Sequence, residues 1–225
     1  MLIYGKQPVA YALAHHQDKI QTLYISKDLD KKEFSRLHKL DCELKRIPHE
    51  AAQKMCKNAN HQGYLCEMDE LTLADSSIYN NSNFILVLSA LSDVGNIGAL
   101  IRSAYALGVD AIIITGLKNL QLSPIVRTST GAALDMPIMF HTNIHDVLNE
   151  LLMANFSLYA ADMEGEDIRQ ATFKGKRALV LGAEGEGISA RALKKIDNKV
   201  SISMQHNFDS LNVSVAGAIL MDRMR

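Results

Sequence analysis

Short apolar runs that end in polar, glycine-containing turns are the feature that most limits the fold of this chain. Residues 84–88 read Phe-Ile-Leu-Val-Leu, and residues 177–181 end in a similar run. Strands that are apolar on both faces are typical of a parallel sheet with helices on either side. Because segments of helical character separate these strands, the sequence predicts an α/β fold with a parallel sheet.

The chain is predicted to contain two domains joined by a polar linker. Residues 1–70 alternate between short strands and helices, which indicates a small α/β domain. Ser and Asn are concentrated in residues 75–83, so we place the linker at residues 71–83. Residues 84–225 then form the larger domain.

Periodicity and turn residues predict the individual elements. In the first domain we expect helices at residues 7–15 and 30–40 and after Pro48, and strands at residues 20–26, 43–47 and 63–68. In the second domain we expect strands at residues 84–88, 109–115, 138–140, 157–161, 177–181 and 199–203, and helices at residues 96–107, 124–130, 144–154 and 189–195. Gly108 is expected to end one of these helices, because glycine readily adopts the left-handed backbone at that position.

Composition limits the class of protein. The 225 residues are 48% apolar and 22% charged, which is usual for a globular protein. The net charge of −1 argues against a strongly basic nucleic-acid binder. Two local basic clusters remain, for which a solvated surface is the simplest interpretation when each is taken alone: Lys174, Lys176 and Arg177, and Arg191, Lys194, Lys195 and Lys199.

Neither a membrane span nor secretion is predicted. The sequence has no apolar run of about 18 residues, and its N-terminus lacks the layout of a signal peptide. Cys42, Cys56 and Cys66 are odd in number and lack C-x-x-C spacing, so neither a zinc site nor a disulfide framework is expected. We therefore predict a cytoplasmic protein with no bound metal.

The first of three polar turns follows the strand at residues 84–88. Asn96 is a candidate helix cap, and Gly95 and Gly98 allow the backbone to approach a ligand closely. Arg102 lies between one and two helical turns further on, from where its long side chain can reach back. Taken alone, this turn is equally well explained as a capped helix with a surface arginine.

The second turn is the glycine loop at residues 182–187, Gly-Ala-Glu-Gly-Glu-Gly. Its spacing matches neither the G-x-G-x-x-G of dinucleotide sites nor a Walker A loop. Glu184 and Glu186 would repel a pyrophosphate. The loop therefore suits a neutral or cationic ligand, with an ordinary strand-to-helix turn as the alternative.

The third turn begins the segment at residues 207–218, where a polar loop leads into a helix of small apolar residues. Ser210 is the expected N-cap, because its hydroxyl can accept a hydrogen bond from the first helical turn. Asn212 is then expected inside that first turn, where its polar side chain can face a ligand.

Together and in this order, the motifs closely resemble those of the SpoU (TrmH) family of RNA ribose 2′-O-methyltransferases in the SPOUT superfamily. They read Asn96-x-Gly98-x-x-x-Arg102, then Leu179-Val180-Leu181-Gly182-Ala183-Glu184-Gly185-x-Gly187, then Ser210-Leu211-Asn212-Val213-Ser214-x-Ala216. The resemblance covers residues 84–225 and is greatest to members that methylate a guanosine of bacterial large-subunit (23S) ribosomal RNA. Residues 1–70 resemble the family's L30e-like RNA substrate-binding domain, through Ile3-Tyr4-Gly5 and His61-Gln62-Gly63.

Two prolines that are usual in the family are absent here. The family usually carries Asp-Pro before the asparagine of the first motif, where this chain reads Asp93-Val94-Gly95-Asn96. In the third motif, Ile202-Ser203-Met204 replaces the usual Ile-Pro-Met. Proline stiffens a loop and carries no reactive group, so these departures concern loop geometry rather than the reaction.

The resemblance implies a deep trefoil knot in the C-terminal domain and S-adenosylmethionine as the cofactor. It also implies a homodimer through that domain and RNA as the partner. The residues implied to bind the cofactor are Gly182, Ala183, Glu184, Gly185, Gly187, Ile202, Met204 and Leu211. A sulfonium cation explains why an acidic glycine loop is suitable for this ligand.

The active-site residues implied by the resemblance are Asn96, Arg102, Glu184, Ser210 and Asn212. A ribose hydroxyl is a poor nucleophile unless its proton is removed or its developing charge is stabilised. Because a guanidinium stays protonated in proteins, Arg102 is better suited to stabilise charge or hold a phosphate than to act as the base. Glu184 or a water is then the candidate proton acceptor.

Three alternatives remain open from the sequence. One is a transfer-RNA 2′-O-methyltransferase of the same superfamily. Another is a non-catalytic RNA-binding or ribosome-assembly protein, although such a protein has no chemical need for all five active-site residues. An unrelated Rossmann enzyme is the most remote, because the glycine loop is not a phosphate loop.

Overall fold

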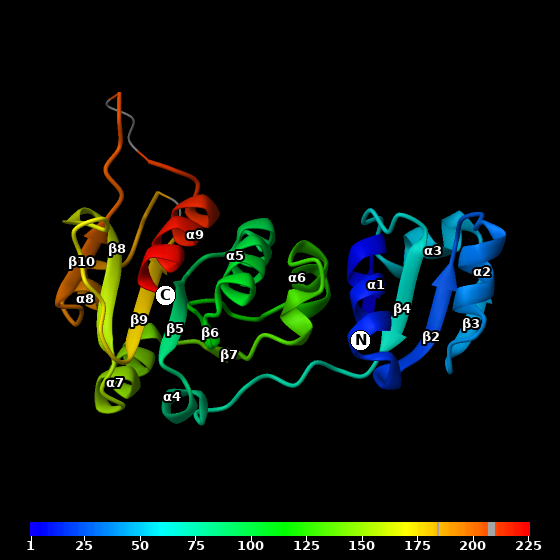
Figure 1. Ribbon diagram of the computed structural model, residues 1–225, viewed down its shortest axis with the longest axis horizontal. Coiled ribbons are helices and arrows are strands. Elements are labelled where there is room, and N and C mark those ends of the chain that lie inside the picture. Colours follow the sequence, from blue (N-terminus) through cyan, green and yellow to red (C-terminus); the bar gives the residue numbers. More distant parts are fainter. Residues whose placement is uncertain (184, 207–209) are drawn as a thin grey trace. The chain divides into compact units, whose positions relative to one another are not determined.

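The computed structural model describes residues 1–183, 185–206 and 210–225 of the chain. The chain divides into two compact units, each with one sheet (Figure 1). Met1–Thr72 and Gln121–Leu134 form the first unit, and Leu73–Leu120 and Asp135–Arg225 form the second.

The first unit contains a four-stranded mixed sheet in the order β1-β4-β2-β3. Its elements are β1 (Leu2–Tyr4), α1 (Lys6–His15), η1 (Gln17–Lys19), β2 (Ile20–Ile25), α2 (Lys31–Leu37), β3 (Glu43–Arg46), α3 (His49–Met55), β4 (Tyr64–Met68), α6 (Leu122–Thr128) and η2 (Ala132–Leu134). Strand β4 is antiparallel to β1 and β2, whereas β2 and β3 are parallel. Strand β1 was not predicted from the sequence.

Residues 121–134 pack in the first unit although they lie between two strands of the second. Arg127 in α6 donates from Nε to the Asn60 carbonyl (2.9 Å), and its guanidinium lies 5.8 Å from the Tyr4 ring centroid. Gly131 follows α6 with a φ of 100°, and a Cβ there would lie 2.7 Å from the Tyr11 side chain. These long-range contacts explain why local sequence could not assign the segment to this unit.

The second unit contains a six-stranded parallel sheet in the order β10-β8-β9-β5-β6-β7. Its elements are α4 (Ile78–Asn81), β5 (Phe84–Ser89), α5 (Val94–Leu107), β6 (Ala111–Thr115), β7 (Ile138–His141), α7 (Ile144–Met153), β8 (Ser157–Asp167), β9 (Arg177–Gly182), α8 (Ala190–Leu193), β10 (Asn198–Ser201) and α9 (Val213–Met224). Every residue of β5 and of β6 is buried, as expected for strands covered on both faces. The predicted α/β class with a parallel sheet is confirmed; the trefoil knot stays a prediction.

Part of the segment predicted as a linker is folded into the second unit. Ile78 and Tyr79 in α4 are buried in the same core as Ile85 of β5. The Ala74 N–H also donates to the Ile138 carbonyl (2.8 Å) beside β7. The polar composition of residues 75–83 concealed these two apolar side chains.

The two predicted helix caps are both displaced. Helix α5 is capped by Asp93, whose Oδ1 accepts from the Asn96 N–H (2.7 Å), so Asn96 lies inside the first turn. Helix α9 is capped by Asn212, whose Oδ1 accepts from the Ser214 N–H (2.9 Å), so Ser210 is not the cap. In each case another side chain with a suitable acceptor, two or three residues from the predicted cap, caps the helix instead. Gly108 ends α5 as predicted, with a φ of 78°.

Helix α9 packs closely on α5 and on the end of β9. Gly217 permits this, because a Cβ at that position would lie 2.4 Å from Leu100 Cδ2 and 2.8 Å from Leu181 Cδ1. The contact brings the start of α9 beside the start of α5. Two of the three sequence motifs therefore meet.

Candidate functional site

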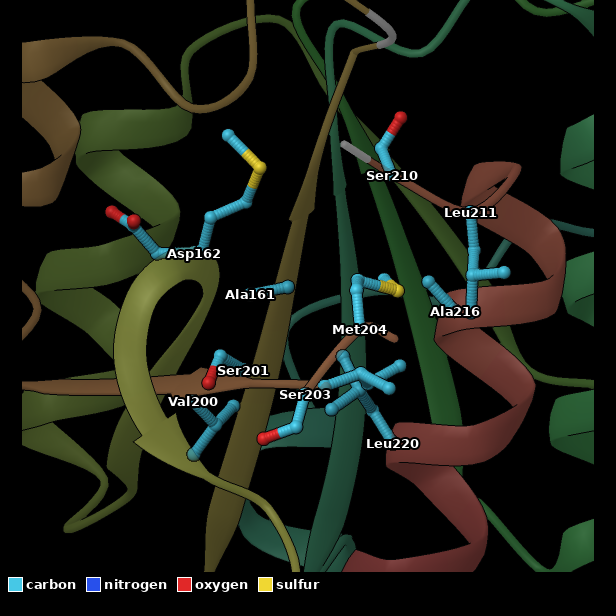
Figure 2. A pocket seen from close by; sticks show the side chains of 12 residues that line it. Ala161, Asp162, Val200, Ser201, Ser203, Met204, Ser210, Leu211, Ala216 and Leu220 are labelled. Carbon is cyan, nitrogen blue, oxygen red and sulfur yellow. The ribbon is translucent and has the colours of Figure 1, made fainter. Parts of the chain in front are cut away.

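A cavity of about 560 Å³ lies beside α9 in the second unit. The start of α9 forms one side, residues 161–163 of β8 form the other, and β10 with the segment after it lies between them (Figure 2). The lining residues are Ala161, Asp162, Met163, Val200, Ser201, Ile202, Ser203, Met204, Ser210, Leu211, Ala216 and Leu220.

Four of the residues predicted for the site line this cavity. Ile202, Met204 and Leu211 were predicted to bind the cofactor, and Ser210 to take part in catalysis. Figure 2 shows the side chains of Met204 and Leu211 projecting into the space between β10 and α9. The structure thus brings residues from two separate loops to one cavity.

The described residues of the glycine loop form a tight turn at the end of β9, outside the cavity lining. The Gly187 N–H donates to the Ala183 carbonyl (2.8 Å), which closes the turn. A Cβ on Gly182 would lie 2.2 Å from the Gly187 carbonyl carbon, so only glycine fits there. Gly185 and Gly187 adopt left-handed backbones, with φ of 82° and 67°. Glu184 lies outside the described residues.

A hydrogen bond joins the first and third motifs directly. Asn212 donates from Nδ2 to Asn96 Oδ1 (3.0 Å), across 116 positions of sequence. Asn212 Oδ1 accepts from both the N–H and the hydroxyl of Ser214, at 2.9 and 2.6 Å. These bonds fix which way the Asn212 amide faces, and they hold the starts of α5 and α9 together.

Arg102 is exposed on α5 and is not brought to the Asn96–Asn212 pair by its helix position. Six residues separate it from Asn96, which corresponds to roughly 9 Å along the helix and about 120° around it. The described contacts place Ser210 at the cavity and the two asparagines next to each other. None of these described contacts brings Arg102 close to Ser210 or to the two asparagines.

Sequence reasoning missed the side of the cavity that β8 provides. Strand β8 continues to Asp167, whereas the prediction ended at residue 161. Its second half reads Asp-Met-Glu-Gly-Glu-Asp, which has no apolar alternation to indicate a strand. Pairing with β10, a later segment of the chain, holds it in place. Only the spatial structure could therefore reveal Asp162 and Met163 as lining residues.

Charged side chains stabilise this side of the cavity. Lys199 Nζ lies 2.8 Å from Asp162 Oδ2, and the Glu164 N–H donates to Asp162 Oδ1 (3.0 Å). The hydrogen bond from Lys199 lowers the pKa of Asp162, and the Glu164 N–H adds to this. Asp167 is held by Arg169 and Ser203, which lower the pKa of its carboxyl in that order of importance. Both carboxylates are ionised near neutral pH.

The basic clusters noted in the sequence are used partly for internal contacts. Lys176 Nζ donates to the Tyr79 carbonyl (2.9 Å), and Lys195 Nζ donates to Asn149 Oδ1. Lys199 pairs with Asp162. A purely solvated surface therefore does not describe these three lysines.

The cavity has the size and lining of a small-molecule site. Its volume lies within the range of about 300–1,000 Å³ that is usual for small-molecule sites. The lining found among the described residues combines apolar side chains, serine hydroxyls and the carboxylate of Asp162, and it contains no lysine or arginine. Because Lys199 is paired with Asp162, the charge of the carboxylate in this lining is balanced, which suits a cofactor without phosphate such as S-adenosylmethionine.

Comparison with known proteins settles the family. The model of the SpoU rRNA methylase family matches residues 83–222, and the model for RNA 2′-O ribose methyltransferase substrate binding matches residues 2–74. The chain belongs to the SpoU rRNA methylase family. This confirms the family resemblance predicted from the three motifs, and with it the prediction of an RNA methyltransferase.

Relatives of known name and structure match along almost the whole chain. The 23S rRNA (guanosine-2′-O-)-methyltransferase RlmB of Pasteurella multocida is 32% identical over 97% of this chain and 95% of its own. A solved RNA 2′-O ribose methyltransferase is 26% identical, with a TM-score of 0.77 over 100% of this chain and 87% of its own. The SpoU methyltransferase AviRb of Streptomyces viridochromogenes, in complex with AdoMet, has a TM-score of 0.79 at 23% identity, covering 100% and 88% of the two chains.

Proposed function

We propose that this protein transfers a methyl group from S-adenosylmethionine to a ribose 2′-hydroxyl of RNA, at a guanosine of 23S ribosomal RNA. The observation that carries the proposal is the Asn212–Asn96 hydrogen bond beside a cavity lined by Ile202, Met204 and Leu211. Family membership supports the reaction class. The name of the Pasteurella multocida relative supports the choice of RNA and base.

The cavity side chains and the glycine loop together form the proposed cofactor site. Ile202, Met204 and Leu211 bury the apolar parts of the cofactor, which supplies an already activated methyl group. The turn at residues 182–187 has backbone N–H and C=O groups near the carboxyl end of β9, where ligands of α/β sheets commonly bind. Gly182, Ala183, Gly185 and Gly187 belong to this turn.

The protein must orient the ribose hydroxyl and stabilise the charge that develops on its oxygen. We assign orientation to Asn96 and Asn212, because their amides are fixed by hydrogen bonds before any ligand binds. We assign Ser210, which lines the cavity, to contact with the reacting groups. Arg102 is assigned to a phosphate or to the forming alkoxide, with Glu184 as the candidate proton acceptor.

A homodimer through the second unit accounts for the exposed position of Arg102. Val215 and Ile219 lie four residues apart on α9, so they share a face, and they are 48% and 38% exposed. Apolar side chains on one helix face suit contact with a second copy of the chain. In such a dimer, Arg102 of one subunit can serve the site of its partner.

RNA capture is assigned to the first unit, at the end of its sheet where strands β1, β2 and β3 terminate, which we call the carboxyl edge of the sheet. Lys6 and Lys27 follow β1 and β2 there, and Arg46 ends β3; all three are exposed. Lys27 Nζ lies 5.0 Å from the Tyr64 ring centroid, and Gln62 Oε1 accepts from the Lys6 N–H (3.0 Å), so the edge is ordered. The opposite edge carries mainly acidic residues: Asp18, Asp41, Glu43, Asp69 and Glu70.

A transfer RNA substrate is the second candidate, and a non-catalytic RNA-binding protein is the third. The match of the substrate-binding model to residues 2–74 favours ribosomal RNA, because the named 23S rRNA relative also matches along 97% of this chain. We place the reaction in the cytoplasm, where the ribosome is assembled. Within the described parts of the chain, no helix has the length and apolar character needed to cross a membrane.

Transfer of a labelled methyl group tests the proposed function. The purified protein is incubated with labelled S-adenosylmethionine and either a 23S rRNA transcript or bulk transfer RNA, followed by digestion to nucleosides. The expected product is 2′-O-methylguanosine from the 23S rRNA transcript. Label in transfer RNA alone would support the second candidate, and cofactor binding without any transfer would contradict the proposed activity on both RNAs.

A further inference from the structure

An irregular register in β8 creates a projecting segment beside the cavity. Lys199 of β10 pairs with Ala160, and the next residue, Val200, pairs with Glu166. Residues 161–165 are therefore looped out of the pairing, and we call them the β8 bulge. An irregularity in pairing disrupts the ladder locally and re-aims the side chains of the unpaired residues.

Both ends of the β8 bulge are fastened to β10. At its start, Asp162 is paired with Lys199, with the carboxylate side chain 19% exposed. At its end, the Gly165 carbonyl accepts from Ser201 Oγ (2.8 Å), and a Cβ on Gly165 would lie 2.5 Å from the Val200 nitrogen. The β8 bulge is thus an ordered wall of the cavity, and Met163 lies near its centre.

Met163 is unusual because it is both highly exposed and part of the cavity lining. Its exposed fraction is 77%, which is matched in this chain by Met153 at the end of α7, with 78%. Met153 does not line the cavity. A methionine side chain is flexible, and its sulfur makes favourable contacts with aromatic rings. Met163 can therefore cover a flat ligand at the mouth of the cavity.

The position of the β8 bulge decides which part of a ligand it meets. The asparagines assigned to the reaction lie at the start of α9, whereas Figure 2 shows Ala161 and Asp162 on the opposite side of the cavity, with Met204 between. The methyl donor must present its sulfonium near α9. Two groups extend from the sulfonium, the adenosine and the amino-acid chain, and the flat adenine ring is the one that suits contact with a methionine thioether.

We propose that Met163 covers the adenine ring of the cofactor and that the β8 bulge determines affinity for adenosine-containing ligands. This inference rests on the proposed function, because it takes S-adenosylmethionine as the occupant of the cavity. The Asp162–Lys199 pair and the Gly165–Ser201 hydrogen bond hold the β8 bulge in place before the ligand arrives, so little ordering is needed on binding.

Calorimetric titration of the full chain with S-adenosylmethionine, S-adenosylhomocysteine and 5′-methylthioadenosine tests the proposal. Met163→Ala is expected to weaken all three ligands by a similar factor of about 3 to 10, because all three contain the adenine ring. Met163→Leu keeps the apolar cover and is expected to retain most of the affinity. Met153→Ala is the control of equal exposure and should bind as the unaltered protein does.

The outcomes separate this inference from the proposed function. If the unaltered protein binds S-adenosylmethionine and Met163→Ala binds it equally well, the role of Met163 is contradicted while the proposed function stands. A loss restricted to the two ligands that carry the amino-acid group would also contradict it. If the unaltered protein does not bind S-adenosylmethionine, the proposed function itself fails. Thermal melting without ligand should be the same for Met163→Ala and Met153→Ala, since both side chains are exposed.

Discussion

The two units differ in what holds their proposed sites in place. In the second unit, the site lies at the ends of buried strands, where the backbone at Gly182 and the close approach at Gly217 leave no room for a side chain. In the first unit, the proposed RNA-binding edge consists of exposed side chains, Lys6, Lys27 and Arg46, at the end of a small sheet. Substitutions at these tightly packed glycines of the second unit should therefore abolish function, whereas substitutions in the first unit should reduce it gradually.

The largest effect is expected from Gly182→Ala. The added methyl group meets the backbone of Gly187 at 2.2 Å, so the loop must move. We expect S-adenosylmethionine binding to fall below detection in calorimetry, and the melting temperature to fall by about 4–10 °C. Gly175→Ala is the control for backbone strain without a clash, because its φ is 66° and nothing lies within 4 Å of a Cβ there. Normal cofactor binding by Gly182→Ala would exclude the glycine loop from the site.

Arg102→Ala is expected to abolish methyl transfer while leaving cofactor affinity unchanged. The loss should be about 10²–10³-fold in kcat, the usual consequence of removing one charge-stabilising donor. Single-turnover transfer to 23S rRNA and calorimetry with S-adenosylmethionine measure the two properties separately. If cofactor binding were lost to the same degree as transfer, Arg102 would belong to the cofactor site instead.

Asn212→Ser tests the helix-capping role of Asn212 separately from the proposed catalytic role of its amide. Serine is also a good N-cap, so the stability of α9 should fall by less than about 1 kcal/mol. The hydrogen bond to Asn96 is lost, and kcat is expected to fall by about 10-fold to 100-fold. Thermal melting measures the change in stability, and transfer assays measure the change in kcat. An unchanged kcat would show that Asn212 serves only to cap the helix.

Charge removal in the first unit is expected to produce a graded effect. Lys6→Ala and Lys27→Ala should each weaken RNA binding a few-fold and reduce the salt dependence of log K by about 0.7–0.9. Cofactor affinity should not change. Lys19→Ala, at the opposite edge of the sheet, is the control for loss of one positive charge. Equal effects of Lys19→Ala and Lys27→Ala on RNA binding would show that the two edges do not differ.

The smallest effect concerns the pH dependence of stability. Lys199 lowers the pKa of Asp162, so this carboxyl stabilises the fold above its unfolded pKa of about 4 and stops doing so as the pH falls through its folded pKa. Asp162→Asn should therefore cost less than about 1 kcal/mol at pH 7 and nothing at pH 2, given that the pair is partly solvated. Urea unfolding at the two pH values measures this. A larger cost at the lower pH would contradict the assignment.

The sequence predicted much of the second unit because its strands carry strong local signals. Residues 84–88 and 177–181 are apolar enough to be recognised as buried strands, and Gly108 marks a helix end. The N-caps were misplaced by a few residues, since Asp93 and Asn212 compete with neighbours of the same chemical type. Those errors are local and leave the fold unchanged.

The parts that the sequence could not predict depend on long-range pairing. The second half of β8 is strand only because β10 pairs with it, so Asp162 and Met163 gave no signal as cavity residues. The Asn212–Asn96 bond joins residues far apart in the chain, and the motif resemblance alone suggested that they act together. Residues 121–134 belong to the first unit through contacts of Arg127 with Asn60 and of Gly131 with Tyr11. These partners lie far away in the sequence, so no local signal indicated the contacts.

The most direct test of the central claim is a map of ribose 2′-O-methyl groups on ribosomal and transfer RNA, from cells with and without the gene for this protein. We expect one guanosine of the large-subunit RNA to lose its methyl group when the gene is deleted, with all other sites unchanged. An unchanged map, or a loss confined to transfer RNA, would contradict the claim that this chain methylates 23S ribosomal RNA.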